Sequence, residues 1–388
     1  MRVLVLHSRY LSGPVSGENR VVEDETELLR THGHEVVTWT PSPDELSSEI
    51  RAGARTVWSP EAAARVRELV DRHRPEVVHV HNLYPMLSPA VLRAFPDDVA
   101  VVMTLHNYRY ACLPGTFLLD GQVCEDCLGK VPWRGVVRGC FRGSVAASGA
   151  LASSIVLHRS IGSFDRIDRM LAGSEFMRGK HIAAGVPGDR LAVQRNFAVP
   201  EARRRGAGSH FLFVGRLAPE KGLRFLVDVW RDVEAPLLIV GEGPELEELR
   251  RTAPANVTLR GPVAGSEVPE LLRDARALVV PSQWYEGTPR SVIEAYAVGV
   301  PVLSSRIGSL SEVVVDGSSG YLLPRDDRRA WIQAVGALGD DRHALELGDQ
   351  AYRLWTRDYR PDRAIGSLEA AYAIAIERRA RLARARSR

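Results

Sequence analysis

Two glutamates, Glu286 and Glu294, stand eight residues apart around a Gly-Thr-Pro-Arg sequence. Thr288 offers a side-chain cap and Pro289 a pre-set dihedral angle, so we expect a helix to begin here. Glu286 would then lie in the loop before the helix, and Glu294 about two turns into it. Because carboxylates accept hydrogen bonds from hydroxyl groups, this pair suits a ribose or another sugar.

The residues around this pair predict an anion site. The apolar run 277–280 ends in Pro281 and is typical of a buried parallel strand. A helix after such a strand directs the N–H groups of its first turn, here near Arg290 and Ser291, toward the carboxyl end of the sheet. The N–H groups can donate hydrogen bonds to a diphosphate, and the two carboxylates beside them can accept from sugar hydroxyls. Together they indicate a nucleotide-sugar site. Either glutamate taken alone is better explained as an ordinary solvated acid.

Arg216 and Lys221 form a second chemical group. Gly215-Arg216 follows an apolar run directly, and Lys221 comes five residues after Arg216, where a helix should start. The forked guanidinium and the compact ammonium could together hold a pyrophosphate while its bond to a sugar breaks. An ordinary charged surface loop is the alternative, and we interpret Glu220 as a surface residue.

Histidines gather where two strands of the N-terminal half end. The strand that starts at Val99 delivers His106 and Asn107 to the sheet edge, and His79 and His81-Asn82 leave the neighbouring strand. A neutral imidazole can donate to a sugar hydroxyl or to a scissile oxygen, and it handles protons near pH 7. A lone histidine is usually structural, but one that directly follows an apolar strand favours a site.

A glycine-containing loop follows the first strand. The strand 2–6 leads into the loop 12–19 and then into a helical stretch from about Arg20 to Thr31, a layout that lets Gly17 approach a phosphate. The Gly-x-Gly-x-x-Gly spacing of dinucleotide-binding proteins is absent. A tight turn without a ligand is an equally good interpretation.

Length and composition set the outer limits. A chain of 388 residues exceeds one ordinary core and predicts two domains. A net charge of +3 is too small to argue for nucleic acid. No apolar run approaches the roughly 20 residues of a membrane span, and the first strand is too short for a signal-peptide core. We expect a cytoplasmic protein; its arginine-rich end could meet the inner face of the membrane but is better explained as a solvated terminus.

Strands and helices alternate in both halves, which predicts an α/β fold with doubly wound parallel sheets. The polar segment 200–209 is the best candidate for a linker, and residues 361–388 have a helical pattern. Strands are expected at residues 2–6, 35–38, 77–80, 99–104, 169–172, 210–215, 237–240, 257–259, 277–280 and 301–304.

These motifs together resemble those of the retaining GT-B glycosyltransferases of family 4, the glycosyl transferases group 1. The resemblance rests on Gly17, His106, the stretch 215–222, Gly241-Glu242-Gly243 and the Glu-x7-Glu pair, and it is strongest from residue 213 to 323. It implies two Rossmann-like domains that face a cleft. Residues 1–199 would be the acceptor-side domain with a cysteine-rich insertion at 111–143, residues 200–360 the nucleotide-sugar domain, and residues 361–388 a helix that crosses back to the first domain.

The resemblance also implies a role for each motif residue. His106, Arg216, Lys221 and Glu286 would act in catalysis, with the two cations on the diphosphate and His106 near the transferred sugar. Glu294 would bind the ribose diol, and Gly17 would approach the phosphate from the other domain. The nucleotide-sugar contacts implied in this way are Gly17, Gly215, Arg216, Lys221, Gly241, Pro262 and Val263 beside the base, Glu286, Gly287, Thr288, Pro289, Arg290 and Glu294.

The implied reaction moves a hexose or aminosugar from a nucleoside-diphosphate sugar to an acceptor hydroxyl with retention and without a catalytic metal. The residues are compatible with this, because an Asp-x-Asp triplet is absent and no carboxylate stands at the strand end beside His106. The acceptor would be a lipid-linked glycan or a small natural product. A sugar-nucleotide epimerase or hydrolase on the same fold, or a non-catalytic glycan-binding subunit, remains an alternative.

All four cysteines fall between Cys112 and Cys140, in the pattern Cys112-x11-Cys124-x2-Cys127-x12-Cys140. A cytoplasmic setting disfavours disulfides. Four thiols around a Cys-x-x-Cys centre have the chemistry of a structural zinc site, although the outer spacings are not those of a standard zinc ribbon. Core or loop cysteines without a ligand, or a redox role, are the alternatives.

Overall fold

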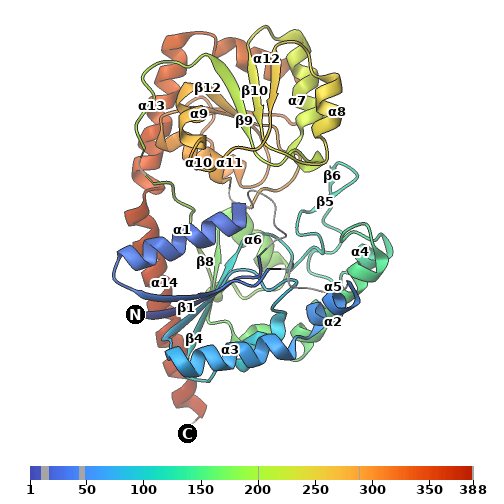
Figure 1. Cartoon of the computed structure of the whole chain (residues 1–388), viewed down its shortest axis with the longest axis vertical. Coiled ribbons are helices and arrows are strands. Elements are labelled where there is room, and N and C mark those ends of the chain that lie inside the picture. Colours follow the sequence, from blue (N-terminus) through green and yellow to red (C-terminus); the bar gives the residue numbers. More distant parts are fainter. Residues whose placement is uncertain (10–16, 43–48, 200, 288, 387–388) are drawn as a thin grey trace. The chain divides into compact units, whose positions relative to one another are not determined.

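The computed structural model describes residues 1–388 except 10–16, 43–48, 200, 288, 387 and 388. The chain forms two compact units (Figure 1). Unit 1 comprises Met1–Thr116, Glu125–Gln194 and Ile365–Arg388. Unit 2 comprises Phe117–Cys124 and Arg195–Ala364.

Unit 1 is built on a six-stranded parallel sheet with the order β2-β1-β3-β4-β7-β8. The apolar runs of β1, β3 and β4 are buried almost throughout, as a parallel sheet covered by helices requires. The chain order reverses between β1 and β3, so the carboxyl ends of these two strands bound the switch point. The strands are β1 (Arg2–Leu6), β2 (Glu35–Trp39), β3 (Val77–Val80), β4 (Ala100–Leu105), β7 (Arg169–Ala172) and β8 (Leu191–Val193).

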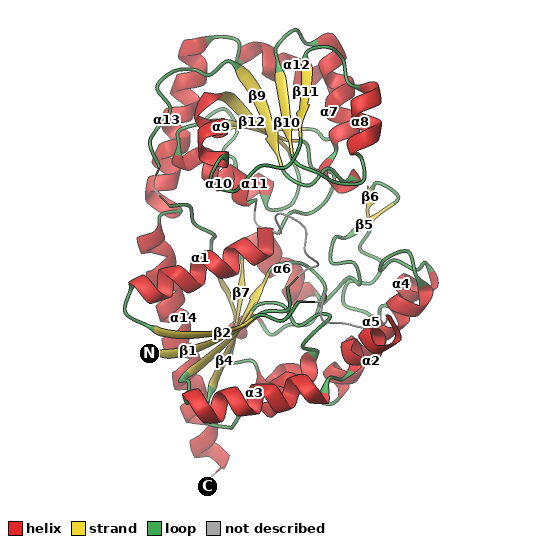
Figure 2. Ribbon diagram, viewed as in Figure 1, coloured by secondary structure: helices red, strands yellow, loops and turns green. Residues whose placement is uncertain are grey.

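Helices cover this sheet, and Figure 2 shows its strands between α1 and α3. The helix α3 begins at a Ser59 cap, whose side chain accepts from the backbone N–H of Ala62, and has Pro60 in its first turn. The longer helices of the unit are α1 (Gly17–Thr31), α2 (Glu49–Val57), α3 (Pro60–His73), α5 (Val145–Ser160), α6 (Glu175–Ala183) and α14 (Pro361–Arg386), and most of α14 lies in unit 1.

Helix α14 is fastened to the rest of unit 1 by buried polar contacts. The Tyr372 hydroxyl lies 2.8 Å from Nδ1 of His79 in β3. The Arg379 guanidinium lies 2.7 Å from a carboxylate oxygen of Asp168, and both side chains are at most 5% exposed. The residues expected to form a terminal helix therefore complete the N-terminal core.

Between β4 and α5 the chain leaves the strand–helix alternation. This insertion contains the short antiparallel pair β5 (Leu118–Leu119) and β6 (Gln122–Val123), followed by the short helix α4 (Trp133–Val137). Helix α4 packs against α5, where the backbone N–H of Phe141 donates to Ser148 Oγ at 2.9 Å.

Unit 2 repeats the architecture with the strand order β11-β10-β9-β12-β13-β14, all parallel. Side chains alternate between the two faces. Leu212 joins one buried cluster with α10 and α13, while Phe211 and Phe213 join another with α7 and α12. The strands are β9 (His210–Val214), β10 (Leu237–Val240), β11 (Val257–Arg260), β12 (Ala275–Val280), β13 (Val302–Ser305) and β14 (Gly320–Leu323).

Seven helices cover the unit 2 sheet within the described residues. They are α7 (Leu223–Val229), α8 (Leu246–Thr252), α9 (Val268–Asp274), α10 (Arg290–Ala297), α11 (Leu310–Val313), α12 (Arg328–Ala337) and α13 (Asp341–Asp358).

The predicted fold class is confirmed, with two local differences. Every expected strand is present within two residues of its expected ends, but β8, β14 and the short pair β5 and β6 had not been expected. The segment expected as a linker is anchored to unit 2 instead of spanning freely in its described part. The Arg204 guanidinium reaches backbone carbonyl oxygens of Arg276 and Ala344, and Arg203 pairs with Asp349 of α13.

Candidate functional site

The predicted nucleotide-sugar residues lie at one edge of the unit 2 sheet. Gly215-Arg216 follows β9, and Pro281-Ser282 follows β12, its neighbour. The chain order reverses between these two strands, and doubly wound sheets bind ligands at such a switch point. Gly241 follows β10, and Pro262-Val263 comes just after the edge strand β11.

Two glycines bring the loops of this edge into close contact. Gly222 has φ +73°, and a Cβ added to it would lie 2.0 Å from the carbonyl oxygen of Pro281. Gly241 has φ +144°, and its Cβ would lie 1.9 Å from the carbonyl oxygen of Gly215. Glycine is therefore required at both positions, and the first contact holds Lys221 against the end of β12.

Lys221 and Glu286 form an ion pair at the switch point. Lys221 Nζ lies 2.8 and 3.1 Å from the two carboxylate oxygens of Glu286, whose side chain is only 9% exposed. Ser282 Oγ donates to the same carboxylate at 2.5 Å, and the ammonium lies 5.3 Å from the centre of the Trp284 ring. Ser309 Oγ donates to the carbonyl oxygen of Glu286 at 2.9 Å. The loop that carries Glu286 is thus held by both backbone and side-chain contacts.

Arg216 pairs with Glu220, which corrects the interpretation of Glu220 as a surface residue. The Arg216 side chain is 66% exposed, whereas that of Glu220 is 15% exposed and accepts from the Arg216 guanidinium. The carbonyl oxygen of Glu220 also accepts from the backbone N–H of Gln283. Glu220 therefore orients Arg216 and joins the two loops of the switch point. The four-residue spacing within Arg216-x3-Glu220 is the signal that could have indicated this contact.

Helix α10 begins at Arg290, one residue after Pro289. The expected cap, Thr288, lies outside the described residues. Pro289 occupies the N-cap position with ψ 89° and makes no side-chain cap. Glu294 lies in the second turn of α10, closer to the start of the helix than expected, and its carboxylate accepts from Arg290 Nε at 2.6 Å.

Three cation–carboxylate pairs thus share this edge: Arg216 with Glu220, Lys221 with Glu286, and Arg290 with Glu294. Each pair places positively charged hydrogen-bond donors beside carboxylate oxygens that can accept hydrogen bonds from hydroxyl groups. An ammonium has three donors and a carboxylate about four acceptor positions, so neither kind of group is exhausted by its partner. The edge can therefore bind an anion and a polyol side by side.

The equivalent edge of unit 1 is occupied by histidines. His106 follows β4, and its Nε2 lies 2.9 Å from Nδ1 of His81, which follows β3. The two rings stack with centroids 5.2 Å apart. His7, after β1, lies 2.8 Å from Asn19 Oδ1 and faces His81 edge-on. The sequence correctly predicts that His106 and His81 share one edge.

Burial keeps these imidazoles neutral. It lowers the pKa of His106 to about 4 and that of His81 well below its ordinary value, and neighbouring histidines lower the latter further. His106 can therefore donate or accept a hydrogen bond at pH 7. The lowered pKa does not favour the suggested role of His106 as a proton handler near pH 7, because desolvation and the nearby His7 disfavour the imidazolium ion.

His79 lies within β3 and not at its end, which corrects its expected place at the edge. Its nitrogens lie 2.8 Å from the hydroxyl oxygens of Tyr372 and Thr104, so the ring is fully hydrogen-bonded. Glu25 of α1 lies close by, with a carboxylate oxygen 3.7 Å from Nε2 of His81. Burial raises the pKa of Glu25 to about 8, so this acid is largely protonated at neutral pH.

Glu25, His79 and His81 have ligand atoms close enough together for one metal ion. His79, however, would have to give up a hydroxyl partner to bind one, and a protonated Glu25 is a poor ligand. We therefore interpret the trio as a packed polar core. Glu25 was missed by the sequence analysis because α1 carries four other acids, Glu18, Glu23, Asp24 and Glu27, and the sequence does not indicate which of the five is buried.

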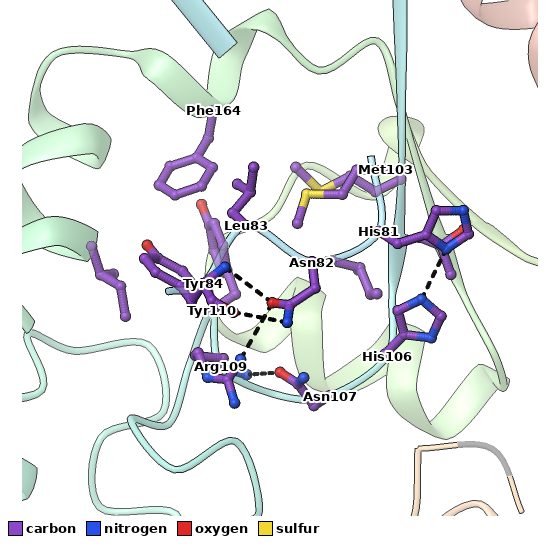
Figure 3. A pocket seen from close by; sticks show the side chains of 14 residues that line it. His81, Asn82, Leu83, Tyr84, Met103, His106, Asn107, Arg109, Tyr110 and Phe164 are labelled. Atoms are coloured by element: carbon purple, nitrogen blue, oxygen red, sulfur yellow. Dashed lines mark hydrogen bonds between the residues drawn. The ribbon is translucent and has the colours of Figure 1, made fainter. Parts of the chain in front are cut away.

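A pocket adjoins His81 and His106 in unit 1, lined mainly by apolar and aromatic side chains (Figure 3). Asn82 lies in its floor: its amide donates to the Tyr84 carbonyl oxygen at 3.0 Å, and its oxygen accepts from Arg109 at 3.4 Å. The Arg109 backbone N–H donates to Asn107 Oδ1 at 3.0 Å. The pocket offers an apolar wall and a polar floor beside the histidine pair. Sequence reasoning named Asn82 and Asn107 but missed Tyr84 and Arg109.

Gly17, expected in a loop, is the first residue of α1, and the residues 10–16 before it lie outside the described part of the chain. A Cβ on Gly17 would meet nothing within 4 Å. Packing of the described residues therefore does not require a glycine here, and the approach of Gly17 to a phosphate stays a prediction.

Three of the four cysteines belong to segments that converge on Gly135 of α4. A Cβ at Gly135 would lie 3.8 Å from Cys127 Sγ and 3.0 Å from the side chain of Leu113, the neighbour of Cys112. The Cys140 backbone N–H donates to the Gly135 carbonyl oxygen at 2.9 Å. Cys124 precedes Cys127 by three residues in the sequence. The segments of three cysteines thus meet near Gly135, but within the described residues no three cysteine sulfurs lie close enough together to share one metal ion.

Comparison with known proteins identifies the class of this architecture. The chain aligns with sucrose-phosphate synthase from Thermosynechococcus elongatus at a TM-score of 0.71 and 16% identity, covering 96% of this chain and 98% of that one. Anabaena HepE in complex with UDP and glucose gives a TM-score of 0.66 at 15% identity, with 96% and 99% covered. Because the sequence identities to these two structures are low, the structural similarity establishes the fold alone, and that fold is GT-B.

Two family models match consecutive parts of the chain. Residues 15–201 match the model described as Glycosyltransferase Family 4, and residues 208–341 match Glycosyl transferases group 1. A GDP-mannose-dependent alpha-(1-6)-phosphatidylinositol monomannoside mannosyltransferase from Mycolicibacterium smegmatis is 27% identical over 363 residues, 86% of this chain and 87% of that protein. The chain belongs to the GT-B glycosyltransferases of the family 4 type, and it is an enzyme that takes its sugar from a nucleotide donor. Within the described residues, no helix has both the length and the apolar character of a membrane span.

Proposed function

We propose that this enzyme transfers a hexose or aminosugar from a nucleoside-diphosphate sugar to an acceptor hydroxyl with retention of anomeric configuration. The observation that carries the proposal is the Lys221–Glu286 pair at the switch point of the unit 2 sheet. This pair sets a diphosphate-binding cation against a carboxylate that can accept sugar hydroxyls. The acceptor we propose is a lipid-linked glycan or a small natural product.

The departing diphosphate is stabilised by Arg216, Lys221 and the start of α10 in this proposal. Lys221 is pre-positioned by the Gly222–Pro281 contact and by Glu286, so little reorganisation is needed when charge develops on the leaving group. Arg216 is largely exposed and held from one side by Glu220, so its outer face can reach a phosphate. The helix start at Arg290 adds the positive end of its dipole.

The two glutamates divide the recognition of hydroxyl groups. Glu294 in α10 would accept from the ribose diol, and the more buried Glu286 from the donor sugar. Pro262 and Val263 would flank the base after β11. Gly215, Gly241 and the 287–290 backbone would let the nucleotide lie close to the main chain.

His106 would donate a neutral hydrogen bond to the transferred sugar. Its Nε2 is engaged by His81, so Nδ1 is the atom left for the substrate. Attack from the face of the leaving group, with a phosphate oxygen that accepts the proton of the acceptor hydroxyl, needs neither a metal nor a protein base. This accords with a histidine whose pKa is too low for proton transfer near pH 7.

The test is a transfer reaction with product analysis. GDP- and UDP-sugars are both screened by thermal shift, because a relative is named as GDP-mannose-dependent and a structural neighbour holds UDP. With the best donor, NMR of the product reports the configuration of the new bond. Retention with turnover that depends on acceptor supports the proposal, and inversion contradicts it. Donor turnover without acceptor would favour an epimerase or a hydrolase.

We also propose a structural zinc ion on Cys112, Cys124, Cys127 and Cys140. Four thiolate ligands leave no open position, so the ion would hold the insertion together without taking part in catalysis. Elemental analysis of protein purified without metal-affinity resin should give about one zinc per chain. A Cys124→Ser/Cys127→Ser variant should lose the zinc and melt earlier while keeping nucleotide affinity. Zinc at background level in reduced protein, with a variant of unchanged stability, would contradict this assignment.

A further inference from the structure

Exposed apolar side chains are concentrated in one short part of unit 1. Of the fifteen large apolar side chains that are exposed in the described residues, seven fall between Val131 and Ile161. Trp133 is 60% exposed, Val137 68%, Val131 59% and Val145 58%. Trp133 and Val137 are four residues apart on α4, so they share one face of it. Tryptophan is rarely left this open in a core-packing helix, so the exposure points to a partner surface.

Basic side chains accompany these apolar ones at regular intervals. Lys130, Arg134, Arg138 and Arg142 recur every four residues, and all four are exposed. The sequence from residue 128 to 164 contains no aspartate or glutamate. Asp126 pairs with Arg134 and Arg138, which leaves the surface with a clear excess of positive charge. We call the exposed side chains of the segment 130–145, on and beside α4, the α4 face: Val131, Trp133, Val137 and Val145 with Lys130, Arg134, Arg138 and Arg142.

We propose that the α4 face binds the surface of an anionic lipid bilayer. Apolar and aromatic side chains that can enter the headgroup region, beside cations that attract anionic lipid, are the composition of an interfacial membrane contact. Tryptophan favours the membrane–water boundary, and the Arg134 guanidinium stacks 5.7 Å from the Trp133 ring centre. The contact is interfacial and requires no spanning helix. The inference does not depend on the proposed function.

Charge decides against the other occupants. A symmetric contact between two copies of the chain would set four cations of one α4 face against four of the other. A nucleic acid would engage the cations but would leave the exposed valines without a role. A bilayer satisfies both kinds of side chain at once.

The experiment is sedimentation of the full chain with vesicles. Phosphatidylcholine vesicles are compared with vesicles that also contain phosphatidylglycerol, at low and at high salt. We expect binding to the anionic vesicles that weakens with salt. Lys130→Gln/Arg142→Gln should lower the partition coefficient roughly 30-fold, from about 1 kcal/mol for each cation near an anionic surface. Trp133→Ser/Val137→Ser should lower it roughly tenfold.

Matched control variants test whether vesicle binding depends on the α4 face or on exposed cations and apolar side chains anywhere on the protein. Leu345→Ser/Val315→Ser removes exposed apolar side chains from unit 2, and Arg251→Gln/Arg329→Gln removes exposed cations there. Both controls should bind vesicles like the original chain, and all variants should keep their melting temperature. Equal binding to both vesicle types, equal losses in the control variants, or a doubled mass in solution that Trp133→Ser abolishes would overturn the proposal.

Discussion

At the carboxyl edge of the unit 2 sheet, Arg216, Lys221 and Arg290 are each held by a carboxylate. At the corresponding edge of unit 1, His7 and His81 are buried and His106 is half-buried, and their lowered pKa values keep all three neutral. Both edges lie at a switch point of a parallel sheet, so topology alone would make them equivalent. The difference lies in electrostatics: one edge keeps full charges in place with counter-charges, and the other excludes charge by burial.

This contrast assigns a different kind of ligand contact to each edge. Fixed cations suit a diphosphate, because they supply a Coulombic attraction that neutral donors lack. Neutral imidazoles suit hydroxyl groups and would give a diphosphate no Coulombic attraction. The nucleotide should therefore depend on unit 2 for affinity, while unit 1 should affect the rate more than the binding.

Replacing Lys221 should have the largest effect. Lys221→Ala removes a diphosphate donor and leaves Glu286 buried without its cation, so we expect kcat/KM to fall roughly 100-fold or more. Steady-state kinetics and calorimetry with the nucleoside diphosphate measure this. Lys180→Ala, which breaks an ion pair with Glu125 in unit 1, is the matched control and should keep its activity. Normal kinetics of the Lys221→Ala enzyme would contradict the assignment of the charged unit 2 edge to the diphosphate.

The two glutamates should separate by ligand. Glu294→Ala should raise the dissociation constant of the bare nucleoside diphosphate roughly tenfold, because every donor carries the ribose. Glu286→Ala should weaken the sugar nucleotide more than the bare diphosphate. Calorimetry with both ligands on both variants resolves this, and Glu312→Ala in α11 serves as control. Equal losses for both ligands in both variants would mean that the roles are not divided in this way.

His106→Ala should lower kcat by about tenfold or less, the value of a neutral hydrogen bond, and leave nucleotide affinity unchanged. The variant removes the partner of His81 Nδ1 but no charge. Rapid-quench or steady-state rates are measured together with the dissociation constant of the diphosphate, and His32→Ala at the end of α1 is the control. A weakened diphosphate with an unchanged rate would reverse the assignment of the two edges.

Acid should loosen unit 1 before unit 2. Burial lowers the pKa of His106 and His181 to about 4 and that of His79 to about 3, against about 6.5 when unfolded. The unfolded chain therefore binds more protons below pH 6.5, and stability is lost as pH falls toward 4, by on the order of 1–3 kcal/mol in unit 1.

Nine of the eleven histidines lie in unit 1. Hydrogen exchange, corrected for its intrinsic pH dependence, should show amides in β3 and β4 losing protection between pH 7 and 4.5 while β9 and β12 keep theirs. Equal losses in both sheets would contradict this prediction.

The pKa of Glu25 is shifted upward, opposite to the histidine shifts, and it gives unit 1 a second pH dependence. Its pKa is raised to about 8, so the folded chain holds a proton that the unfolded chain releases near pH 4.5. The stability that this proton represents is lost progressively as pH rises from about 4.5 to about 8, and no more is lost above that range. Glu25→Gln should therefore flatten the decline of unit 1 stability between these two pH values.

The sequence predicts best where one local pattern decides the outcome. The apolar run 277–280 ends in Pro281 and indicates a buried strand, and Gly215-Arg216 directly follows another such run, so both positions are predictable from short-range rules. The resemblance to family 4 rests on the same local motifs. Ser309, by contrast, binds the carbonyl oxygen of Glu286 across 23 residues, and nothing near Ser309 in the sequence indicates this contact.

Burial explains the remaining errors. Whether Glu220 is solvated or holds Arg216, and whether His106 titrates near pH 7 or near 4, depends on which segments pack around them. The His79 contacts come from Thr104, 25 residues away, and from Tyr372, 293 residues away. Residue types reveal what a side chain can do, but its environment is set by long-range packing that one sequence does not display.

The contribution of α14 to unit 1 has a consequence for synthesis. A ribosome makes residues 1–194 first, then the 170 residues of Arg195–Ala364, and only afterwards the segment that begins at Ile365. At about 5–20 residues per second, unit 1 waits roughly 10–35 seconds for its missing helix. During that interval the buried Asp168 lacks Arg379, and His79 lacks Tyr372. The unit that is translated first is thus the one completed last, because unit 2 already has its whole chain when the residues of α14 that pack on unit 1 are made.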